Sequence, residues 1–475
     1  MAKPKTIAVI GGGSAGFTAA RTAHDLGGRV LLFMGEHPDH ASLCIETGCM
    51  PSKAIFEPID AMYHAKRHGW FEVTPRKPNA YLAQIVGWKD RQIASFRESR
   101  NEAIREHASE NFQIIRARAR FIDAHTVEAN GERYTIDAAI IATGSANTIP
   151  DLGDLSVGPD ALWTNNEILS NTVVPKSLTV VGAGPVALEF SQRYARLGCA
   201  VTLASRSRLL ARFPRKFGER LGEIYEREGI RILIGHSLGA IKRESDGEYR
   251  LSLEGESGSE GLTSERVLLA TGRHPAVEDL NLPGVGVARD CKGKLTVGPD
   301  MRVAGCENIF AAGDVAGLRQ VVHQAHIEAG IAAENAVTDG NRPWQRRSNL
   351  QVVFSDPEFA FAGQSVETAE KAGHQVVTAS AESRDVGKLL LAGDDLGFGE
   401  FVADAETRRL LGAALLCDDA SNLIHLPAYA IDHEQTVHEL TAAEYYHPTK
   451  MEIVSEIGDA LCRALGGKPF CRAQE

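Results

Sequence analysis

The chain begins its first structural unit with the stretch Thr6-Ile7-Ala8-Val9-Ile10-Gly11-Gly12-Gly13-Ser14-Ala15-Gly16. Its apolar start is typical of a short buried strand, and a glycine-rich turn follows at once. A helical stretch then extends to residue 26, and residues 30–34 resemble a second buried strand. This order predicts a strand–helix–strand unit whose glycine turn lies at the end of the first strand.

A second copy of the pattern lies at residues 177–204 and contains the turn Gly182-Ala183-Gly184-Pro185-Val186-Ala187. In such units the first glycine permits a tight turn, and the second lets backbone N–H groups approach a pyrophosphate. The helix N-terminus adds partial positive charge. Either turn alone is compatible with tight-turn glycines and nothing more. Two copies in the same context favour two dinucleotide sites.

Length and composition limit the possible classes of protein. The chain has 475 residues, of which 43% are hydrophobic and 24% charged, which is typical of a soluble α/β protein. This length suggests about three domains. The formal charge is −11 and no run of Lys or Arg concentrates positive charge, which argues against a nucleic-acid partner.

Two further absences in the sequence bear on location and metals. No apolar run reaches the roughly 18 residues that a membrane helix needs. The strand at residues 6–10 begins too early to follow a signal peptide, so we expect a cytoplasmic protein without a membrane partner. Six of the eight cysteines are scattered without a metal-like spacing, and no metal site is expected.

Further strands are expected between and after the two units. Residues 112–142 indicate a small β region with a type I′ hairpin signal at Asn130-Gly131. Three short motifs follow apolar strands, namely Ala142-Thr143-Gly144, Ala270-Thr271-Gly272 and Gly313-Asp314. A helix that carries His323 comes next. From about residue 349, strand-like segments followed by helices predict a separate α+β domain.

Two cysteines lie close together in the stretch Cys44-Ile45-Glu46-Thr47-Gly48-Cys49-Met50-Pro51-Ser52-Lys53. In a regular α-helix, residues five apart have Cα atoms beyond the roughly 7 Å limit for a disulfide, so bridging Cys44 and Cys49 requires an irregular turn. Gly48 and Pro51 suit such a turn. A helix that begins nearby would favour thiolate over thiol. Spacing alone leaves open that the two are buried cysteines that never pair.

These motifs together resemble those of the class I pyridine nucleotide-disulfide oxidoreductases, which include dihydrolipoamide dehydrogenase, glutathione reductase and mercuric reductase. The resemblance covers nearly the whole chain, and it includes the segment His447-Pro448-Thr449 followed by Glu452. It implies an α/β fold with two Rossmann-like dinucleotide-binding domains, for FAD and NAD(P), and a C-terminal α+β dimerisation domain. The expected division is a first part of the FAD domain, an NAD(P) domain, a central domain that completes the FAD site, and an interface domain, at residues 1–150, 151–272, 273–345 and 346–475.

The resemblance also implies roles for the residues of a redox site. Cys44 would be the thiol that attacks the substrate disulfide, and Cys49 the thiol that faces the flavin and exchanges electrons with it. Lys53 would lie beside flavin N5 and pair with Glu189.

The expected acid–base group lies near the C-terminus. By resemblance, His447 protonates the leaving thiol, is oriented by Glu452, and comes from the partner subunit, so that a homodimer shares each active site. The stretch from Thr449 to Glu452 also fits a capping box at a helix start, with Thr449 as N-cap, and this needs no catalysis. Both roles can hold for Glu452.

The expected FAD contacts come from several distant segments. They are Gly11, Gly13, Ser14, Ala15, Gly16, Glu36, Lys53, Ala119, Thr143, Gly144, Gly313, Asp314 and His323. The position that normally supplies an acid for the ribose is Met34, so Glu36 is expected to take that role. The loop before Cys44 therefore departs from the family pattern.

The second glycine turn is expected to bind the nicotinamide cofactor. The predicted contacts are Gly182, Gly184, Ala187, Ser205, Arg206 and Gly272. Ser205 stands where an acid is usual, and Arg206 and Arg208 follow it. Guanidinium groups suit a 2′-phosphate, so NADPH is the expected cofactor. NADH is the alternative if both arginines are only solvated surface charges.

The leading interpretation is an FAD-dependent NAD(P)H:disulfide oxidoreductase, similar to dihydrolipoamide dehydrogenase, that reduces a small disulfide or a lipoyl group. The alternatives are a thiol-independent flavin transhydrogenase or diaphorase, a metal reductase similar to mercuric reductase, and a non-enzymatic flavin-binding protein. The cysteine pair and His447 argue against the first alternative. The wide spacing of Cys462 and Cys471 argues against the second.

Overall fold

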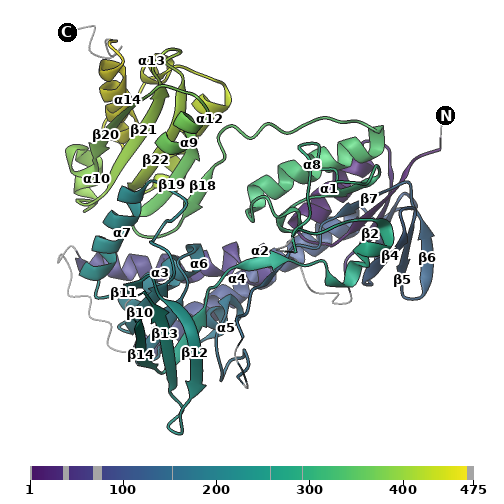
Figure 1. Cartoon of the computed structure of the whole chain (residues 1–475), viewed down its shortest axis with the longest axis horizontal. Coiled ribbons are helices and arrows are strands. Elements are labelled where there is room, and N and C mark those ends of the chain that lie inside the picture. The colour runs from purple at the N-terminus through teal and green to yellow at the C-terminus, as the bar shows by residue number, and fades with distance from the viewer. Residues whose placement is uncertain are drawn as a thin grey trace.

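The computed structural model describes residues 3–35, 42–67, 78–151, 153, 155–256, 258–290 and 293–467 (Figure 1). Among these residues, every helix is too short or too polar to cross a membrane. The described part of the chain also contains short 3-10 helices at Glu278–Leu280, Leu282–Val285, Asp314–Ala316 and Ser383–Asp385.

The first glycine turn belongs to a five-stranded parallel sheet of order β17-β7-β1-β2-β3. Its strands in chain order are β1 Thr6–Ile10, β2 Arg29–Phe33, β3 Phe112–Ile115, β7 Ala138–Ile141 and β17 Ile309–Ala311. Helices α1 (Ser14–Asp25) and α8 (Val322–Thr338) pack against each other on this sheet (Figure 1). The strands are apolar on both faces because both faces are covered.

A three-stranded antiparallel sheet covers the other face of the first sheet. Its strands are β4 Ala119–Asp123, β5 Thr126–Ala129 and β6 Glu132–Thr135. Asn130 and Gly131 have φ angles of 51° and 78°, the positive values that a type I′ turn needs, so the predicted hairpin is confirmed.

The second glycine turn belongs to a four-stranded parallel sheet of order β11-β10-β9-β15. Its strands are β9 Ser177–Val181, β10 Ala200–Ser205, β11 Arg231–Ile234 and β15 Arg266–Leu269. Helices α6 (Pro185–Arg196) and α7 (Arg215–Arg227) cover one face. An antiparallel sheet of β12 Ser237–Arg243, β13 Tyr249–Gly255 and β14 Gly258–Ser264 covers the other. A two-stranded pair, β8 Ser145–Asn147 and β16 Arg273–Pro275, joins the two units.

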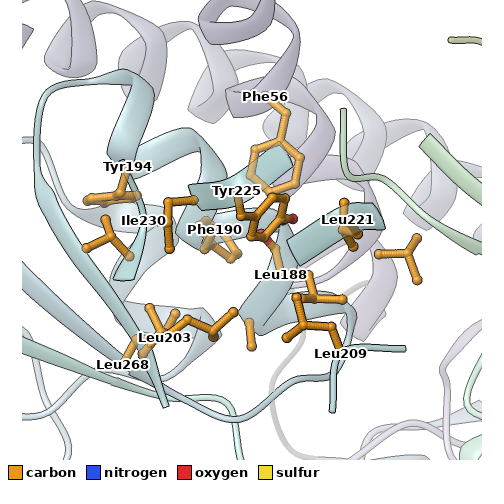
Figure 2. Close-up of a cluster of buried hydrophobic side chains, with 14 of the residues drawn as sticks. Phe56, Leu188, Phe190, Tyr194, Leu203, Leu209, Leu221, Tyr225, Ile230 and Leu268 are labelled. Carbon is orange, nitrogen blue, oxygen red and sulfur yellow. Dashed lines mark hydrogen bonds between the residues drawn. The ribbon is translucent and has the colours of Figure 1, made fainter. Parts of the chain in front are cut away.

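Four helices of the first half carry or surround the cysteine pair. They are α2 Leu43–Glu46, α3 Cys49–Arg67, α4 Pro78–Glu106 and α5 Asn165–Ser170. Helix α3 packs on both α4 and α6. Figure 2 shows Phe56 of α3 inserted beside Phe190 and Tyr225 of the second unit, in the largest of the apolar clusters.

The C-terminal part is a five-stranded antiparallel sheet of order β18-β19-β22-β21-β20 with helices. The strands are β18 Gln351–Val353, β19 Glu358–Gly363, β20 Val376–Glu382, β21 Phe398–Asp404 and β22 Leu410–Cys417. The helices are α9 Val366–Lys371, α10 Gly387–Leu391, α11 Ala420–Leu423, α12 His425–Asp432, α13 Val437–Thr441 and α14 Glu452–Ala464. The fold is thus α/β, with two parallel-sheet dinucleotide units and a C-terminal α+β unit, as the sequence predicted.

A buried ionic network links these parts. Arg196 of α6 donates to Asp60 of α3 at 2.7 Å, to Asp356 at 2.6 Å and to Glu228 at 2.8 Å. Arg193 also donates to Asp60, at 2.6 Å. Both arginine side chains are almost fully buried. The network therefore ties the cysteine-bearing helix, the second unit and the segment before β19 together.

Candidate active site

The first glycine of each turn lies against a carbonyl of the neighbouring strand's end. A Cβ atom on Gly11, whose φ is +116°, would lie 2.2 Å from the Ala142 oxygen. A Cβ atom on Gly182, whose φ is +134°, would lie 2.2 Å from the Ala270 oxygen. Only glycine fits either place. Each Ala-Thr-Gly triplet therefore lies directly against one glycine turn. This explains why the sequence contains one triplet for each turn.

Among the described residues, no side chain caps the start of the helix that follows either glycine turn. The N-cap residues Gly13 of α1 and Gly184 of α6 make no side-chain cap hydrogen bond. A Cβ atom on either glycine would meet nothing within 4 Å among the described residues. First-turn N–H groups and the helix dipole thus face open space, which suits a pyrophosphate.

The predicted FAD motifs meet at one edge of the first sheet. Residues 11–16, the 143–144 pair and the 313–314 pair follow β1, β7 and β17, which are neighbours in the sheet order. Parallel strands place their carboxyl ends together, where dinucleotides bind. Ala119 lies buried at the start of β4, and His323 lies in the first turn of α8. Glu36 lies outside the described residues.

The Gly313–Asp314 loop is held by buried acids. The Gly313 N–H donates to Glu328 at 2.8 Å, and Ser145 donates to Asp314 at 2.6 Å. Burial raises the pKa of Asp314, and it raises the pKa of Glu328 to about 7. The Thr143 hydroxyl donates a hydrogen bond to the Ala276 carbonyl at 2.6 Å, so this donor is already paired within the chain.

An arginine that sequence reasoning missed lies beside the first glycine turn. Arg100 of α4 donates a hydrogen bond from its Nη2 atom to the Gly12 carbonyl. Its Nη1 is buried and has no partner in the part of the chain that the structure describes. Burial lowers the pKa of Arg100 to about 10. An unpaired buried guanidinium nitrogen next to an uncapped helix start fits the negative phosphates of FAD.

The two cysteines lie on either side of a helix break. Cys44 is in α2, Cys49 is the first residue of α3, and the irregular turn between them holds Gly48. Both are free thiols, and the Cys44 and Cys49 side chains are hydrogen-bonded to each other. That hydrogen bond lowers the pKa of Cys49 to about 7 against the effect of burial, and the Lys53 ammonium lowers it further. The same hydrogen bond and burial raise the pKa of Cys44. Cys49 is therefore the thiolate of the pair.

Lys53 and Glu189 form an ion pair next to the thiols. Lys53 Nζ lies 2.8 Å from Glu189 Oε2, and the Glu189 side chain is only 7% exposed. The other carboxylate oxygen accepts from the Phe354 N–H at 3.0 Å, and Lys53 lies 4.1 Å from the Phe354 ring centre. A buried carboxylate needs such partners because burial otherwise disfavours its charge.

His447 is oriented by Glu452. His447 Nδ1 lies 2.7 Å from Glu452 Oε1, and the second carboxylate oxygen accepts from the Thr449 N–H at 3.0 Å. The Thr449 half of the predicted capping box is wrong: the Thr449 hydroxyl donates to the Tyr446 carbonyl, and α14 begins with Met451 as N-cap. The His447 side chain is 78% exposed, and Figure 1 places α14 far from α2.

Residues 5–329 match the family model of the pyridine nucleotide-disulphide oxidoreductases, and residues 350–457 match the dimerisation domain of the same family. The chain belongs to the pyridine nucleotide-disulphide oxidoreductase family. It is accordingly an FAD-dependent oxidoreductase that acts on a sulfur group with a pyridine nucleotide as electron donor.

Individual relatives of this oxidoreductase carry different names. A dihydrolipoyl dehydrogenase of Thermus scotoductus is 31% identical over 97% of this chain and 98% of its own length. A mercuric reductase of Lysinibacillus sphaericus is 30% identical over 91% of this chain and 78% of its own length. Among solved structures, the HOCl-induced flavoprotein disulfide reductase RclA from Escherichia coli shares the fold with a TM-score of 0.82, at 22% identity, over 96% of this chain and 99% of that one.

The nucleotide-selecting region of the oxidoreductase differs from the expectation at one arginine. Ser205 ends β10, and Arg206 is exposed without a hydrogen bond or ion pair among the described residues. Arg208 is not available for a phosphate, because its guanidinium donates to carbonyls at 3.2, 3.1 and 2.7 Å, those of Leu210, Ala211 and Phe213. The expectation of two phosphate-binding guanidiniums is therefore wrong for Arg208, which instead closes the loop before α7.

The lowered pKa of Cys49 leads to a pH prediction. In the reduced oxidoreductase, the rate of Cys49 alkylation by iodoacetamide should rise with pH and level off above a midpoint of about 7, because the thiolate is the reactive form. Lys53→Gln should move this midpoint to higher pH, since the ammonium favours the thiolate. Lys66→Gln, an exposed change on the same helix, should not. An unchanged midpoint in Lys53→Gln would contradict the assignment.

Proposed function

We propose that the enzyme uses NADPH to reduce a small disulfide or a lipoyl group through FAD and the Cys44/Cys49 pair. The observation that carries this proposal is the hydrogen-bonded thiol pair at the α2–α3 break, with the Lys53–Glu189 ion pair beside it. FAD, when bound, supplies a carrier of two electrons between the nucleotide and the dithiol. The residues that would hold it are the glycine turn at 11–16, Arg100, the 143–144 pair, Asp314 and His323, with Glu36 and Ala119.

The thiol chemistry follows from the two unequal cysteines. Cys44, as thiolate, attacks one sulfur of the substrate disulfide, forms a mixed disulfide and expels a thiol that takes a proton from His447. The Cys49 thiolate then attacks the Cys44 sulfur, breaks the mixed disulfide and releases the second substrate sulfur as a thiolate, which takes a proton from water. Two electrons have left the dithiol, and the Cys44–Cys49 disulfide has formed.

Cys44 is protonated, and we propose that a second subunit supplies the base that removes this proton. The protonated Cys44 thiol donates a hydrogen bond to Cys49, so Cys44 needs a base to remove its proton before it can attack. His447 is exposed and bound to Glu452 within its own chain. We therefore propose a homodimer, built through the dimerisation domain, in which His447 of one subunit serves Cys44 of the other. We also propose that the chain divides into domains at residues 1–150, 151–272, 273–345 and 346–475.

The preference for NADPH rests on Arg206 and on the absence of an acid at Ser205. Arg206→Ala should raise the KM for NADPH by about 10- to 100-fold, the effect of losing one charged hydrogen bond, with little change for NADH. Steady-state kinetics with both nucleotides measure this. Arg227→Ala, an exposed change in the last turn of α7, is the matched control. An equal loss for both nucleotides would contradict the 2′-phosphate role.

An anaerobic titration of the yellow protein with NADPH tests the proposed route. We expect a long-wavelength thiolate–flavin absorbance band after two electrons, and its loss in Cys49→Ser. Bleaching of the flavin without this band would favour a transhydrogenase or diaphorase.

Reduction of a metal ion by the same thiol pair is a second candidate. It is supported by the mercuric reductases among the relatives. In this chain Cys462 is buried in α14 and Cys471 lies outside the described residues, so Cys44 and Cys49 would have to bind the ion. NADPH oxidation with Hg(II) in excess thiol, compared with lipoamide disulfide, separates the two candidates.

A further inference from the structure

The turn between the two cysteines is clamped by an ion pair from another helix. Arg97 of α4 donates from Nε to Glu46 Oε1 at 2.7 Å and from Nη2 to Glu46 Oε2 at 2.6 Å. The Glu46 side chain is 12% exposed. A two-point contact between a guanidinium and a mostly buried carboxylate fixes direction as well as distance. Glu46 is therefore held rigidly two residues after Cys44 and three before Cys49.

The two residues that follow Glu46 are also held from outside the turn. The buried Asn165 of α5 donates to the Thr47 carbonyl at 2.6 Å. Ser52 donates to the Gly48 carbonyl at 2.8 Å. A Cβ atom on Gly48 would lie 2.8 Å from the Leu43 oxygen and 3.1 Å from the Cys44 Cα, so the chain folds back tightly on itself there. Glu46, Thr47 and Gly48 are thus each held by a side chain from a different helix, namely α4, α5 and α3.

We propose that the Glu46–Arg97 ion pair is a positioning device that stabilises the Cys44–Cys49 disulfide relative to the dithiol. This inference rests on the proposed function of the two cysteines as a redox pair. A disulfide forms more readily when its thiols are already held close, because less chain entropy is lost on closure. Releasing Glu46 from α4 frees the turn and lowers the effective concentration of one thiol at the other.

The Glu46–Arg97 ion pair also balances charge near the two cysteines. Lys53 and Glu189 are the charged groups that act on Cys49 from α3 and α6, and they already form an ion pair with each other. Arg97 neutralises Glu46 in the same way on the α4 side. Arg100, one turn further along α4, also interacts electrostatically with Glu46. Two cations of α4 therefore stabilise the Glu46 carboxylate in its charged form.

The dithiol–disulfide equilibrium of the holoenzyme tests the inference. The wild type, Glu46→Gln, Arg97→Gln and the double variant are equilibrated anaerobically in dithiothreitol redox buffers, quenched with acid, alkylated and scored by mass for the peptide that contains both cysteines. Each single variant should favour the dithiol about 10-fold more than the wild type, a shift of about 30 mV to less negative potential. The double variant should match the singles, because both remove one interaction. Arg105→Gln, which breaks the exposed Glu98–Arg105 pair on the same helix, is the control and should match the wild type.

The outcomes separate this inference from the function on which it rests. A wild type whose two cysteines never pair in these buffers overturns the proposed redox function. A wild type that pairs, with variants that bind flavin and keep the wild-type equilibrium, overturns only the positioning role. Additive shifts in the double variant also overturn it, since Glu46 and Arg97 would then act separately. Glu46→Gln keeps the shape of the side chain, so it remains informative if Arg97→Gln fails to fold.

Discussion

Cys44→Ser is expected to lower disulfide reduction by a factor on the order of 10³ or more, because serine can neither attack a disulfide sulfur nor form a mixed disulfide. NADPH should still bleach the flavin, since the proposed nucleotide and FAD sites are built on the two glycine turns and do not need this thiol. Steady-state turnover with lipoamide disulfide and anaerobic stopped-flow absorbance measure the two halves separately.

A cysteine outside the pair supplies the control for this result. Cys306 is half-buried, and its thiol lies 3.7 Å from the Val285 carbonyl. Cys306→Ser should keep wild-type turnover. Wild-type turnover in Cys44→Ser itself would mean that the substrate takes electrons directly from the flavin, and the diaphorase interpretation would then replace the disulfide mechanism.

His447→Ala is expected to lower turnover by about 10²- to 10⁴-fold, the usual contribution of a general acid–base group. Mixing this variant with Cys44→Ser, after dissociation and reassociation of subunits, should restore activity. In a mixed dimer one site combines an intact Cys44 with an intact His447 from the other chain, whereas each pure variant has no such site. Glu452→Gln should reduce turnover less, because it removes only the group that orients His447.

One outcome of the mixing experiment would contradict the proposed role of His447. If activity does not recover in mixed dimers whose formation is verified by two different affinity tags, His447 does not act across subunits. His438→Ala is a suitable control, since that histidine lies on α13 and has no role in the proposal.

The sequence was sufficient for those parts of the site that depend on local pattern. Both glycine turns, the Asn130-Gly131 hairpin and the helix break at Gly48 follow from the conformations that only certain residues adopt. The close approach of Gly11 to Ala142 and of Gly182 to Ala270 joins distant segments, but it follows from the parallel pairing of the strands that precede them.

The remaining parts depend on contacts between distant segments, which spacing does not encode. Arg97 of α4 reaches Glu46 across 51 residues of sequence, and Arg100 reaches Gly12 across 88, so nothing local marks them among other arginines. Arg208 was misjudged for the same reason, because its carbonyl partners become visible only when the loop before α7 is folded. Thr449 failed as an N-cap because its hydroxyl donates to the Tyr446 carbonyl, a contact that becomes visible only in the folded loop before α14.

The ionic network around Arg196 has a consequence for how this protein is made. Arg196 and its partner Asp356 are separated by 160 residues, and the Arg196 side chain is almost fully buried once they meet. At a synthesis rate of about 5–20 residues per second, Asp356 leaves the ribosome roughly 8–32 s after Arg196. During that interval the middle of the nascent chain carries a guanidinium that lacks one of its acids and an apolar surface that later contacts β19 and β21. The growing polypeptide therefore passes through a stage in which chaperones have a surface to recognise, and the second dinucleotide unit reaches its final packing only after β21 is made, when more than four-fifths of the chain has been translated.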